Sequence, residues 1–395
     1  MAATEATRRR PARPTADDAA VLAKLSTLDR FLPLWIGLAM AAGLGLGRLI
    51  PSLNDGLDRL QVGTVSLPIA LGLLLMMYPV LAKVRYEELG HPRHDGVSDR
   101  LFFGVSLFLS WVVGPLLMFA LAWLFLADQP AYRTGVIIVG LARCIAMVLI
   151  WNDLAKGDRD RTALLVVFNA LFQVAAYSLL GYFYLTVLPG WLGLDTQGFE
   201  VGIWEVAKTV LIFLGIPLTA GFLTRRVALE RKGREWYDTR FLPRIGPITL
   251  YGLLFTIVLL FAIQGEKITA EPADVARIAL PLLVYFAVMW VAGFVTGKLC
   301  GLPYAQTASM GFTVASNDFE LAIAVAVGVF GATSGQALAG VVGPLIEVPV
   351  LVTLVYVALW ARRYWRTADS GKDGRPAHDG GRLSAPSVDG RRPGV

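Results

Sequence analysis

Blocks of apolar residues, each near the length that crosses a bilayer, alternate with short polar stretches along most of this chain. A helix needs about 20 apolar residues to span roughly 30 Å of hydrocarbon. The pattern predicts an all-α polytopic membrane protein with ten transmembrane helices. Their approximate ranges are residues 31–50, 65–82, 101–127, 134–152, 162–188, 203–224, 244–264, 277–299, 304–330 and 336–362.

Composition supports the same class. Hydrophobic residues make up 55% of the chain and charged residues only 17%, whereas soluble domains carry about 25% charged residues. The net charge of +6 does not indicate nucleic acid, because the basic residues cluster in loops and tails. We expect disordered cytoplasmic tails at 1–28 and 365–395, and two five-helix repeats at 29–190 and 191–364.

The distribution of basic residues predicts the orientation. If the amino terminus is cytoplasmic, 29 of the 36 Lys and Arg residues fall on the cytoplasmic side and 5 on the outside. Cytoplasmic loops of membrane proteins carry this excess. We therefore expect a multi-pass protein of the plasma membrane with both termini in the cytoplasm.

Two apolar blocks are interrupted by polar residues. Arg143 and Cys144 lie in GLARCIAMVLIWND, and Asn317, Asp318 and Glu320 lie in ASNDFELAIAVAV. Polar groups in hydrocarbon are costly unless they face protein or a water-filled cavity. Interruptions at corresponding places in two halves indicate the binding site of an inverted-repeat transporter.

An internal repeat relates the two interruptions. Residues 163–185 align with 337–359 at an offset of 174, with eight of 23 positions identical. The same offset pairs Cys144 with Asp318 and Gln173 with Glu347. Because five helices per repeat is an odd number, the repeats are expected to be inverted. Helices 4 and 9 should break and cross mid-membrane, and helices 4, 5, 9 and 10 should form the substrate-bearing core.

Cys144 has two interpretations. A free cysteine is often a small buried hydrophobe. As a thiolate it would instead be a ligand for soft ions and metalloids, and the neighbouring Arg143 would favour that charged form.

The membrane carboxylates indicate proton coupling. Asp318 and Glu320 are either proton carriers, since buried carboxyl groups exchange protons near neutral pH, or a structural pair with Arg143. Glu347 lies between two prolines, where a structural hydrogen bond and a transport role are both open. Asn169 and Gln173 share a helix face and are either interhelical contacts or substrate ligands.

Other classes lack support. Two cysteines form no disulfide framework, and the three histidines lie in polar segments, so no metal cluster is predicted. We find no H-E-x-x-H or Walker A motif. An enzyme is not expected, nor is any cofactor, and the sequence gives no oligomeric state.

The polar interruptions and their flanks closely resemble the arsenical-resistance arsenite efflux permeases of the bile acid/arsenite/riboflavin transporter superfamily. The resemblance covers roughly residues 25–364. It rests on MMYPVLAKVRYEEL (76–89), GLARCIAMVLIWNDLAKGD (140–158), ASNDFELAIAVAVGVFG (315–331) and SGQALAGVVGPLIEVPVLVTLVYVALW (334–360).

The resemblance implies a ten-span carrier that expels arsenite, and in some members antimonite, in exchange for protons. It implies an essential cysteine at Cys144, as the As(III) ligand, and an essential acid at Glu320. The family often has Asn-Asn where this chain has Asn317-Asp318, so the proton carrier stays open between Glu320 and Asp318. The candidate substrate-binding residues are Cys144, Arg143, Asn169, Gln173, Asn317 and Glu347.

An alternative is a sodium-coupled organic anion carrier of the same superfamily. Sodium prefers oxygen ligands, and Arg143 would then meet the anion. The oxygen ligands would come from Asn317, Asp318, Glu320 and Glu347.

Overall fold

The computed structural model describes residues 32–50, 53–62, 65–86, 96–194, 202–270 and 272–365. Almost all of these residues are helical, and their one sheet is a hairpin of two-residue strands. Within these described residues, five helical segments are, by length and composition, apolar and long enough to cross a membrane. The chain is therefore an all-α membrane protein, as predicted. The predicted tails lie outside the described residues, apart from Trp365.

The described elements up to residue 194 follow the first predicted apolar blocks. Two helices end in or pass through π-helical turns, labelled η. The elements are α3 (Leu32–Leu49), α4 (Leu53–Arg59), β1 (Gln61–Val62), β2 (Val65–Ser66), α5 (Leu67–Ala82), α6 (Val97–Phe108), η2 (Leu109–Val113), α7 (Gly114–Phe125), α8 (Pro130–Leu141), α9 (Met147–Leu154), α10 (Arg159–Tyr182), η3 (Phe183–Val187) and α11 (Leu188–Trp191).

The elements after residue 202 follow the remaining blocks in the same way. They are α12 (Ile203–Val210), η4 (Leu211–Gly215), α13 (Ile216–Trp236), η5 (Tyr237–Phe241), α14 (Leu242–Ala270), α15 (Pro272–Leu299), α16 (Tyr304–Ala315), α17 (Phe319–Phe330) and α18 (Gly335–Ala361).

The four described π-helical turns have a common local feature. Each is followed by a helix with proline at its second position, namely Pro115, Pro189, Pro217 or Pro243. Proline has no N–H to donate and its ring crowds the preceding turn, so the helix widens there. The apolar pattern predicts uninterrupted α-helices here, because hydrophobic periodicity does not detect the loss of a single backbone N–H donor at proline.

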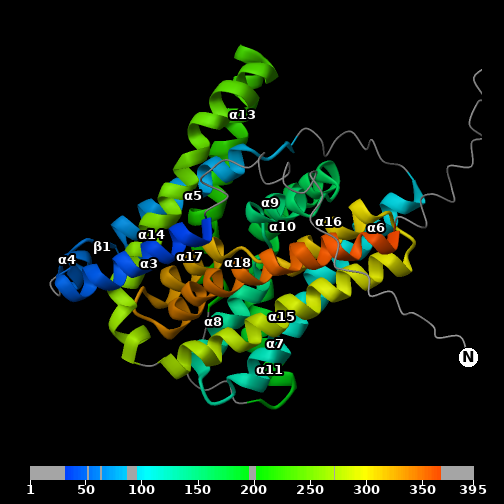
Figure 1. Cartoon of the computed structure of the whole chain (residues 1–395). Helices are drawn as coiled ribbons and strands as arrows, with labels where there is room; N and C mark the ends of the chain where they lie inside the picture. The colour runs from blue at the N-terminus through cyan, green and yellow to red at the C-terminus, as the bar shows by residue number, and fades with distance from the viewer. Residues whose placement is uncertain are drawn as a thin grey trace, which may run out of the picture.

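The segment after the sixth predicted span differs from the sequence prediction. That span was expected to end near residue 224, but the helix labelled α13 runs on to Trp236 across a kink at Gly233, where φ is +80°. Glycine adopts this backbone conformation without a steric penalty. Figure 1 shows α13 extending beyond the rest of the molecule. The extension is helical despite its charge because Arg, Lys and Glu are good helix formers.

The helices pack as two sets. In the first, which we call the panel, α14 packs against α3 and α5, and α13 packs against α5. The contact of α3 with α14 is close, because a Cβ at Gly43 would lie 2.6 Å from the carbonyl oxygen of Val258. In membranes, small residues allow helices this proximity.

The second set, the core, is built from helices that surround the two polar interruptions. α15 packs on α16, α18 and α7, and α8 packs on α7 and α18. The predicted core of helices 4, 5, 9 and 10 is thus too small, because the third and eighth predicted spans (α7 and α15) are packed into it. The helix α12 leads through η4 into α13 of the panel, and α10 and α17 belong to the core. Panel and core meet mainly where α12 contacts these two helices.

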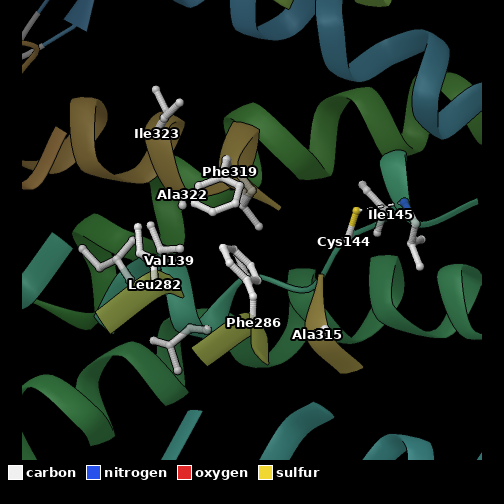
Figure 2. Close-up of a cluster of buried hydrophobic side chains, with 14 of the residues drawn as sticks. Val139, Cys144, Ile145, Leu282, Phe286, Ala315, Phe319, Ala322 and Ile323 are labelled. Carbon is white, nitrogen blue, oxygen red and sulfur yellow. Dashed lines mark hydrogen bonds between the residues drawn. The ribbon is translucent and has the colours of Figure 1, made fainter. Parts of the chain in front are cut away.

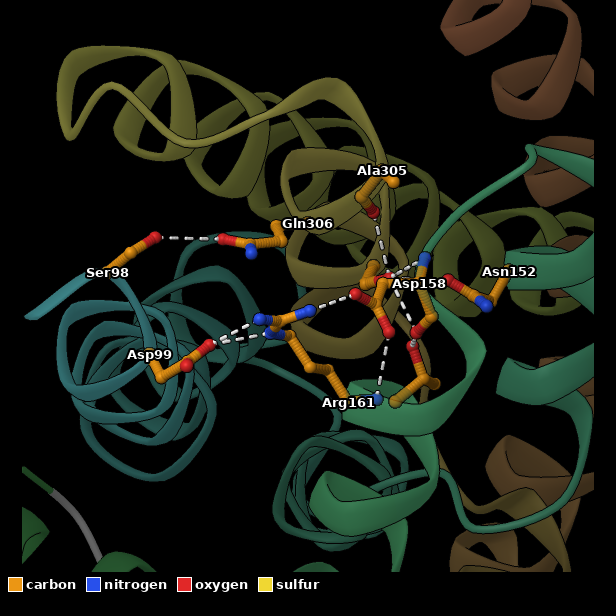
Figure 3. Close-up of polar contacts among 9 residues, drawn as sticks. Ser98, Asp99, Asn152, Asp158, Arg161, Ala305 and Gln306 are labelled. Carbon is orange, nitrogen blue, oxygen red and sulfur yellow. Dashed lines mark hydrogen bonds and ion pairs between the residues drawn. The ribbon is translucent and has the colours of Figure 1, made fainter. Parts of the chain in front are cut away.

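A polar network joins the α9–α10 loop to α6 and α16 (Figure 3). Arg161 at the start of α10 pairs with Asp99 of α6 at 2.6 Å and with Asp158. The backbone N–H of Asp158 donates to the Ser309 hydroxyl at 2.7 Å, and that hydroxyl donates to Asn152 Oδ1 at 2.7 Å. The loop is therefore fastened to the core on three sides.

Candidate functional site

The first interruption is a break between α8 and α9. α8 ends at Leu141, and Ala142 is extended, with φ −81° and ψ 120°. Helical structure resumes only at Met147. Arg143 and Cys144 therefore lie in an extended stretch, as the sequence predicts.

The second interruption is a break between α16 and α17. Ser316 is extended, with φ −80° and ψ 142°, and α17 begins at Phe319. The Asp318 carboxylate caps α17 by accepting the Leu321 N–H at 2.9 Å. Ser, Asn and Asp favour such local bonds over a continuous helix, which explains the position of this break.

The two breaks lie side by side and are joined by backbone hydrogen bonds. Arg143 and Asn317 face each other in an antiparallel bridge. Cys144 N–H donates to the Ser316 carbonyl at 3.4 Å, and Asp318 N–H donates to the Ala142 carbonyl at 3.1 Å. Each break thereby satisfies backbone groups that would otherwise be unpaired in hydrocarbon.

The offset of 174 residues relates these contacts in space. Applied to the Cys144–Ser316 bond, it yields the Asp318–Ala142 bond. Applied to the bond from Arg143 N–H to Gln173 Oε1, at 2.8 Å, it yields the interaction of Asn317 N–H with the Glu347 carboxyl. The match at the level of single hydrogen bonds is an observation independent of the sequence identities.

Cys144 is buried at this junction, with 3% of its surface exposed. Its sulfur accepts the Val148 N–H at 3.3 Å, so it lies at the positive N-terminal end of α9. Figure 2 shows it beside the end of α16 at Ala315, with the rings of Phe286 and Phe319 nearby. The helix N-terminus favours a charge on the sulfur, whereas the apolar surroundings and the neighbouring carboxyl groups favour the neutral thiol.

The carboxyl groups cluster around the second break. Asp318 is buried, and its Oδ2 has no hydrogen-bond partner among the described residues. The Glu320 carboxyl is its direct neighbour and is only half-buried. Both acids, together with Glu347, interact electrostatically with Cys144. The structure thus brings the predicted cysteine and the predicted acids into one region.

Arg143 is fully buried, and its guanidinium bonds to groups other than the carboxyls. Its guanidinium donates to the Tyr285 hydroxyl at 2.7 Å and to the carbonyls of Val314 and Gly140. These carbonyls lie at the C-terminal ends of α16 and α8, where the helix dipole favours a cation. Within the described part of the chain Arg143 makes no ion pair, so it is not the structural partner of Asp318 or Glu320.

The amide residues connect the breaks to neighbouring helices. Asn317 Nδ2 donates to the carbonyls of Val139 and Ala142 at 2.7 and 3.0 Å. Asn169 Oδ1 accepts the indole N–H of Trp111 at 3.1 Å. Several buried polar atoms have no hydrogen-bond partner among the described residues: Asn169 Nδ2, Gln173 Nε2, Asn317 Oδ1, Asp318 Oδ2 and Glu347 Oε1.

Two aromatic residues near the breaks escaped the sequence interpretation. Tyr285 holds Arg143, and Trp111 holds Asn169. These two residues are themselves 174 positions apart, so the repeat offset carried a signal for both. Tyr177, whose hydroxyl donates to the Ile138 carbonyl at 2.7 Å, had no such signal.

Comparison with known proteins defines the class of this membrane protein. Residues 70–271 match the family described as the sodium bile acid symporter family, a family of membrane transporters. This chain has two broken helices whose breaks pair with each other and carry polar residues. Secondary transporters typically bind their substrates at such breaks.

Similar proteins narrow the family further. The arsenical-resistance protein Acr3 of Corynebacterium glutamicum is 57% identical over 86% of this chain and 90% of its own length. The Acr3 protein of Alkaliphilus metalliredigens is 30% identical over 85% of this chain and 94% of its own. An uncharacterized transporter of Synechocystis, slr0944, is 34% identical over 86% and 91%. The chain belongs to the Acr3 arsenical-resistance family of transporters.

Proposed function

We propose that this protein is a secondary active transporter that exports trivalent arsenic from the cytoplasm by exchange for protons. Arsenite is the main substrate and antimonite a second one. The observation that carries the proposal is a buried thiol at a helix N-terminus, in a helix break that is hydrogen-bonded to a second break bearing carboxyl groups. Two relatives bear the name arsenical-resistance protein, which supports the choice of arsenic.

The thiol of Cys144 suits trivalent arsenic because sulfur is a soft ligand. In binding arsenite, an As–S bond forms, one As–O bond breaks, and the thiol proton leaves with the hydroxyl as water. Arsenic stays trivalent, so no oxidant or reductant is needed. Release is the reverse hydrolysis on the other side of the membrane.

The polar atoms without partners complete the proposed binding site. Asn169, Gln173, Asn317 and Glu347 offer both donors and acceptors to the remaining hydroxyls of the substrate. Arg143 stays in the proposed set through its Nε, which has no described partner, but its terminal nitrogens already have three acceptors. We therefore expect Arg143 to contribute least of the set to direct binding.

Glu320 and Asp318 are the proposed proton-coupling groups. Glu320 is the more exposed of the two, so it can exchange protons with water more readily. One carboxyl oxygen of Asp318 caps α17, and this hydrogen bond holds the Asp318 side chain in its present orientation. The pair shares one electrostatic environment, so a proton on either group changes the other.

Transport is proposed to occur by movement of the core against the panel. The breaks belong to the core, which is tightly packed within itself and meets the panel mainly through α12. We propose ten membrane crossings, as two inverted repeats of five, with both termini in the cytoplasm. The pairing of hydrogen bonds by the 174-residue offset supports the repeat, and the 29 cytoplasmic basic residues support the orientation.

A second candidate is a sodium-coupled carrier of an organic anion. It is favoured by the oxygen atoms of Asn317, Asp318 and Glu347 that lack partners, since sodium prefers oxygen ligands. The buried cysteine has no role in that chemistry.

One experiment separates the candidates. Arsenite uptake is measured in everted membrane vesicles with an imposed pH gradient, without one, and with sodium in place of the gradient. Accumulation that requires the pH gradient supports arsenite/proton exchange. Arsenite uptake that ignores the pH gradient and requires sodium would contradict it.

A further inference from the structure

Gln173 of α10 and Glu347 of α18 make the same contact with the two breaks. Gln173 Oε1 accepts the backbone N–H of Arg143 at 2.8 Å, and the Glu347 carboxyl interacts with the backbone N–H of Asn317. Arg143 and Asn317 are also the two residues that face each other in the antiparallel bridge. The two side chains therefore hold the centre of the junction from two different helices.

The backbone geometry explains why both acceptors are required. In an extended chain, successive N–H groups point to opposite sides. Because the N–H groups of Cys144 and Asp318 point to the other break, those of Arg143 and Asn317 point away from it. Each would be a buried donor without a partner if Gln173 or Glu347 were lost, and such donors are strongly unfavourable.

The contact determines the setting of the residues that follow. Arg143 directly precedes Cys144, and Asn317 directly precedes Asp318. Fixing the N–H of the first residue in each pair fixes the peptide plane from which the second extends. All four residues are buried, so the surrounding helices offer them little room to compensate.

We propose that Gln173 and Glu347 are a matched pair of positioning residues, whose acceptor oxygens set the geometry of Cys144 and Asp318 in the two breaks. The proposal rests on the arsenite transport proposed above and deepens it. One oxygen of each side chain serves the backbone, and the second polar atom, Gln173 Nε2 or Glu347 Oε1, remains without a described partner.

The two residues differ in charge but not in the oxygen they offer. Gln173 holds its break with a neutral amide, and Glu347 holds the other with a carboxyl group. For positioning, the acceptor oxygen is needed and the charge is not. Exchanging Gln for Glu at either position therefore keeps the contact, whereas leucine, of similar size, removes it.

The experiment uses full-length protein with Cys300→Ser, so that Cys144 is the one thiol. Everted vesicles are assayed for the KM and maximal rate of arsenite uptake, and for the rate at which N-ethylmaleimide labels Cys144. The variants are Gln173→Leu, Glu347→Leu, Gln173→Glu, Glu347→Gln and the double exchange Gln173→Glu/Glu347→Gln. Gln306→Leu is the control, because it removes a buried glutamine that bonds to Ser98 in the loop network.

We expect each leucine variant to raise the KM about tenfold or more, as loss of an outer positioning contact does at ligand sites. The labelling rate of Cys144 should change in parallel. Each exchange should leave the labelling rate of Cys144 within about threefold of the parent's, because the hydrogen bond to the backbone is kept. The KM is not restricted in this way, since the second polar atom of each side chain belongs to the proposed binding set. The control should label at the parent rate.

Two results would overturn the proposal. One is a Glu347→Gln variant whose Cys144 labelling rate is altered as much as that of Glu347→Leu, which would make the carboxylate itself the important group. The other is a parent rate of labelling in both leucine variants. If a leucine variant is not inserted, the alanine variant at the same position is labelled instead: an altered rate supports the proposal, and the parent rate refutes it. Failure of the parent protein to take up arsenite would instead refute the proposed function, while the labelling rates still test positioning.

Discussion

The two helix breaks share one backbone arrangement and differ in their side chains. Each is extended, each donates an N–H to the other, and each is held by a side chain from a neighbouring helix. The first break has Arg143 and Cys144 where the second has Asn317 and Asp318. The side chain that holds the break is Gln173 in the first case and Glu347 in the second. The shared scaffold thus presents a sulfur on one side and carboxyl groups on the other.

This difference indicates a division of labour. The scaffold solves a problem common to both breaks, which is the pairing of backbone groups in hydrocarbon. Under the proposed function, the side chains are free to diverge, one break toward a soft ligand and the other toward proton exchange. Changes in the first break should then affect arsenite binding, and changes in the second should affect the driving force.

The largest effect is expected from Cys144→Ser. Oxygen is a poorer ligand than sulfur for a soft metalloid, so arsenite export should be abolished while the protein remains in the membrane. The measurement is arsenite uptake by everted vesicles, with membrane content checked by immunoblot. Cys300→Ser is the matched control and should transport nearly as well as the parent. Full arsenite resistance in cells that carry only Cys144→Ser would show that sulfur ligation is wrong.

The next effect concerns Glu320→Gln. An amide cannot cycle a proton, so stimulation of uptake by a pH gradient should be lost. Arsenite should still bind, because Cys144 is intact, and should still equilibrate down its own gradient. Proton coupling is measured as arsenite uptake at several imposed pH gradients. Arsenite binding is measured separately, as protection of Cys144 by arsenite against labelling with N-ethylmaleimide. Normal gradient-driven accumulation would remove Glu320 as the proton carrier.

A packing difference between the breaks can be tested with Gly343→Ala. Gly343 of α18 matches Asn169 of α10 in the repeat, and an added Cβ there would collide with the ring of Phe319 at the start of α17. Overpacking of this kind costs about 1–3 kcal/mol, so thermal stability in detergent should fall. Gly37→Ala, at a position with open space within 4 Å, is the control. Equal melting temperatures for the two variants would mean that Phe319 does not rest on α18.

The smallest effect is expected from Asp318→Asn. Asparagine caps a helix about as well as aspartate, so α17 keeps its start and only one carboxyl group is lost. Export should fall a few-fold at most and should still respond to the pH gradient. A loss as complete as that of Glu320→Gln would instead show that the two carboxyl groups act as one unit.

Two groups of ion pairs differ in how exposed they are to water, and their contributions to stability differ accordingly. Asp128 pairs with Arg277 at the surface, and this hydrogen bond lowers the pKa of the Asp128 carboxyl. A lowered pKa contributes stability above the ordinary pKa, and this is lost as the pH falls through the lowered value. Because the pair is exposed, its contribution is small. Arg161 with Asp99 and Asp158 is more enclosed and fastens a loop, so it is the more consequential network.

Much of the arrangement of the candidate site could be predicted from the sequence, because polar residues are conspicuous in apolar blocks that cross a bilayer. A cysteine beside an arginine, and two acids two residues apart, stand out in apolar blocks. The offset of 174 placed them in register, and the second break followed from the local chemistry of Ser316, Asn317 and Asp318. The membrane class followed from block length and composition alone. These signals are local or periodic, so a single chain reveals them.

Tertiary structure alone decided where the side chains point and which helices support them. Arg143 lies next to Cys144 in the sequence, yet its guanidinium donates to Tyr285 and to the carbonyls at two helix ends rather than to the acids. Likewise, the sequence could not assign α7 and α15 to the core or extend α13 to Trp236. The physical reason is that periodicity reports how each segment partitions between lipid and water. The choice of a partner for each buried donor depends on which segments meet in space.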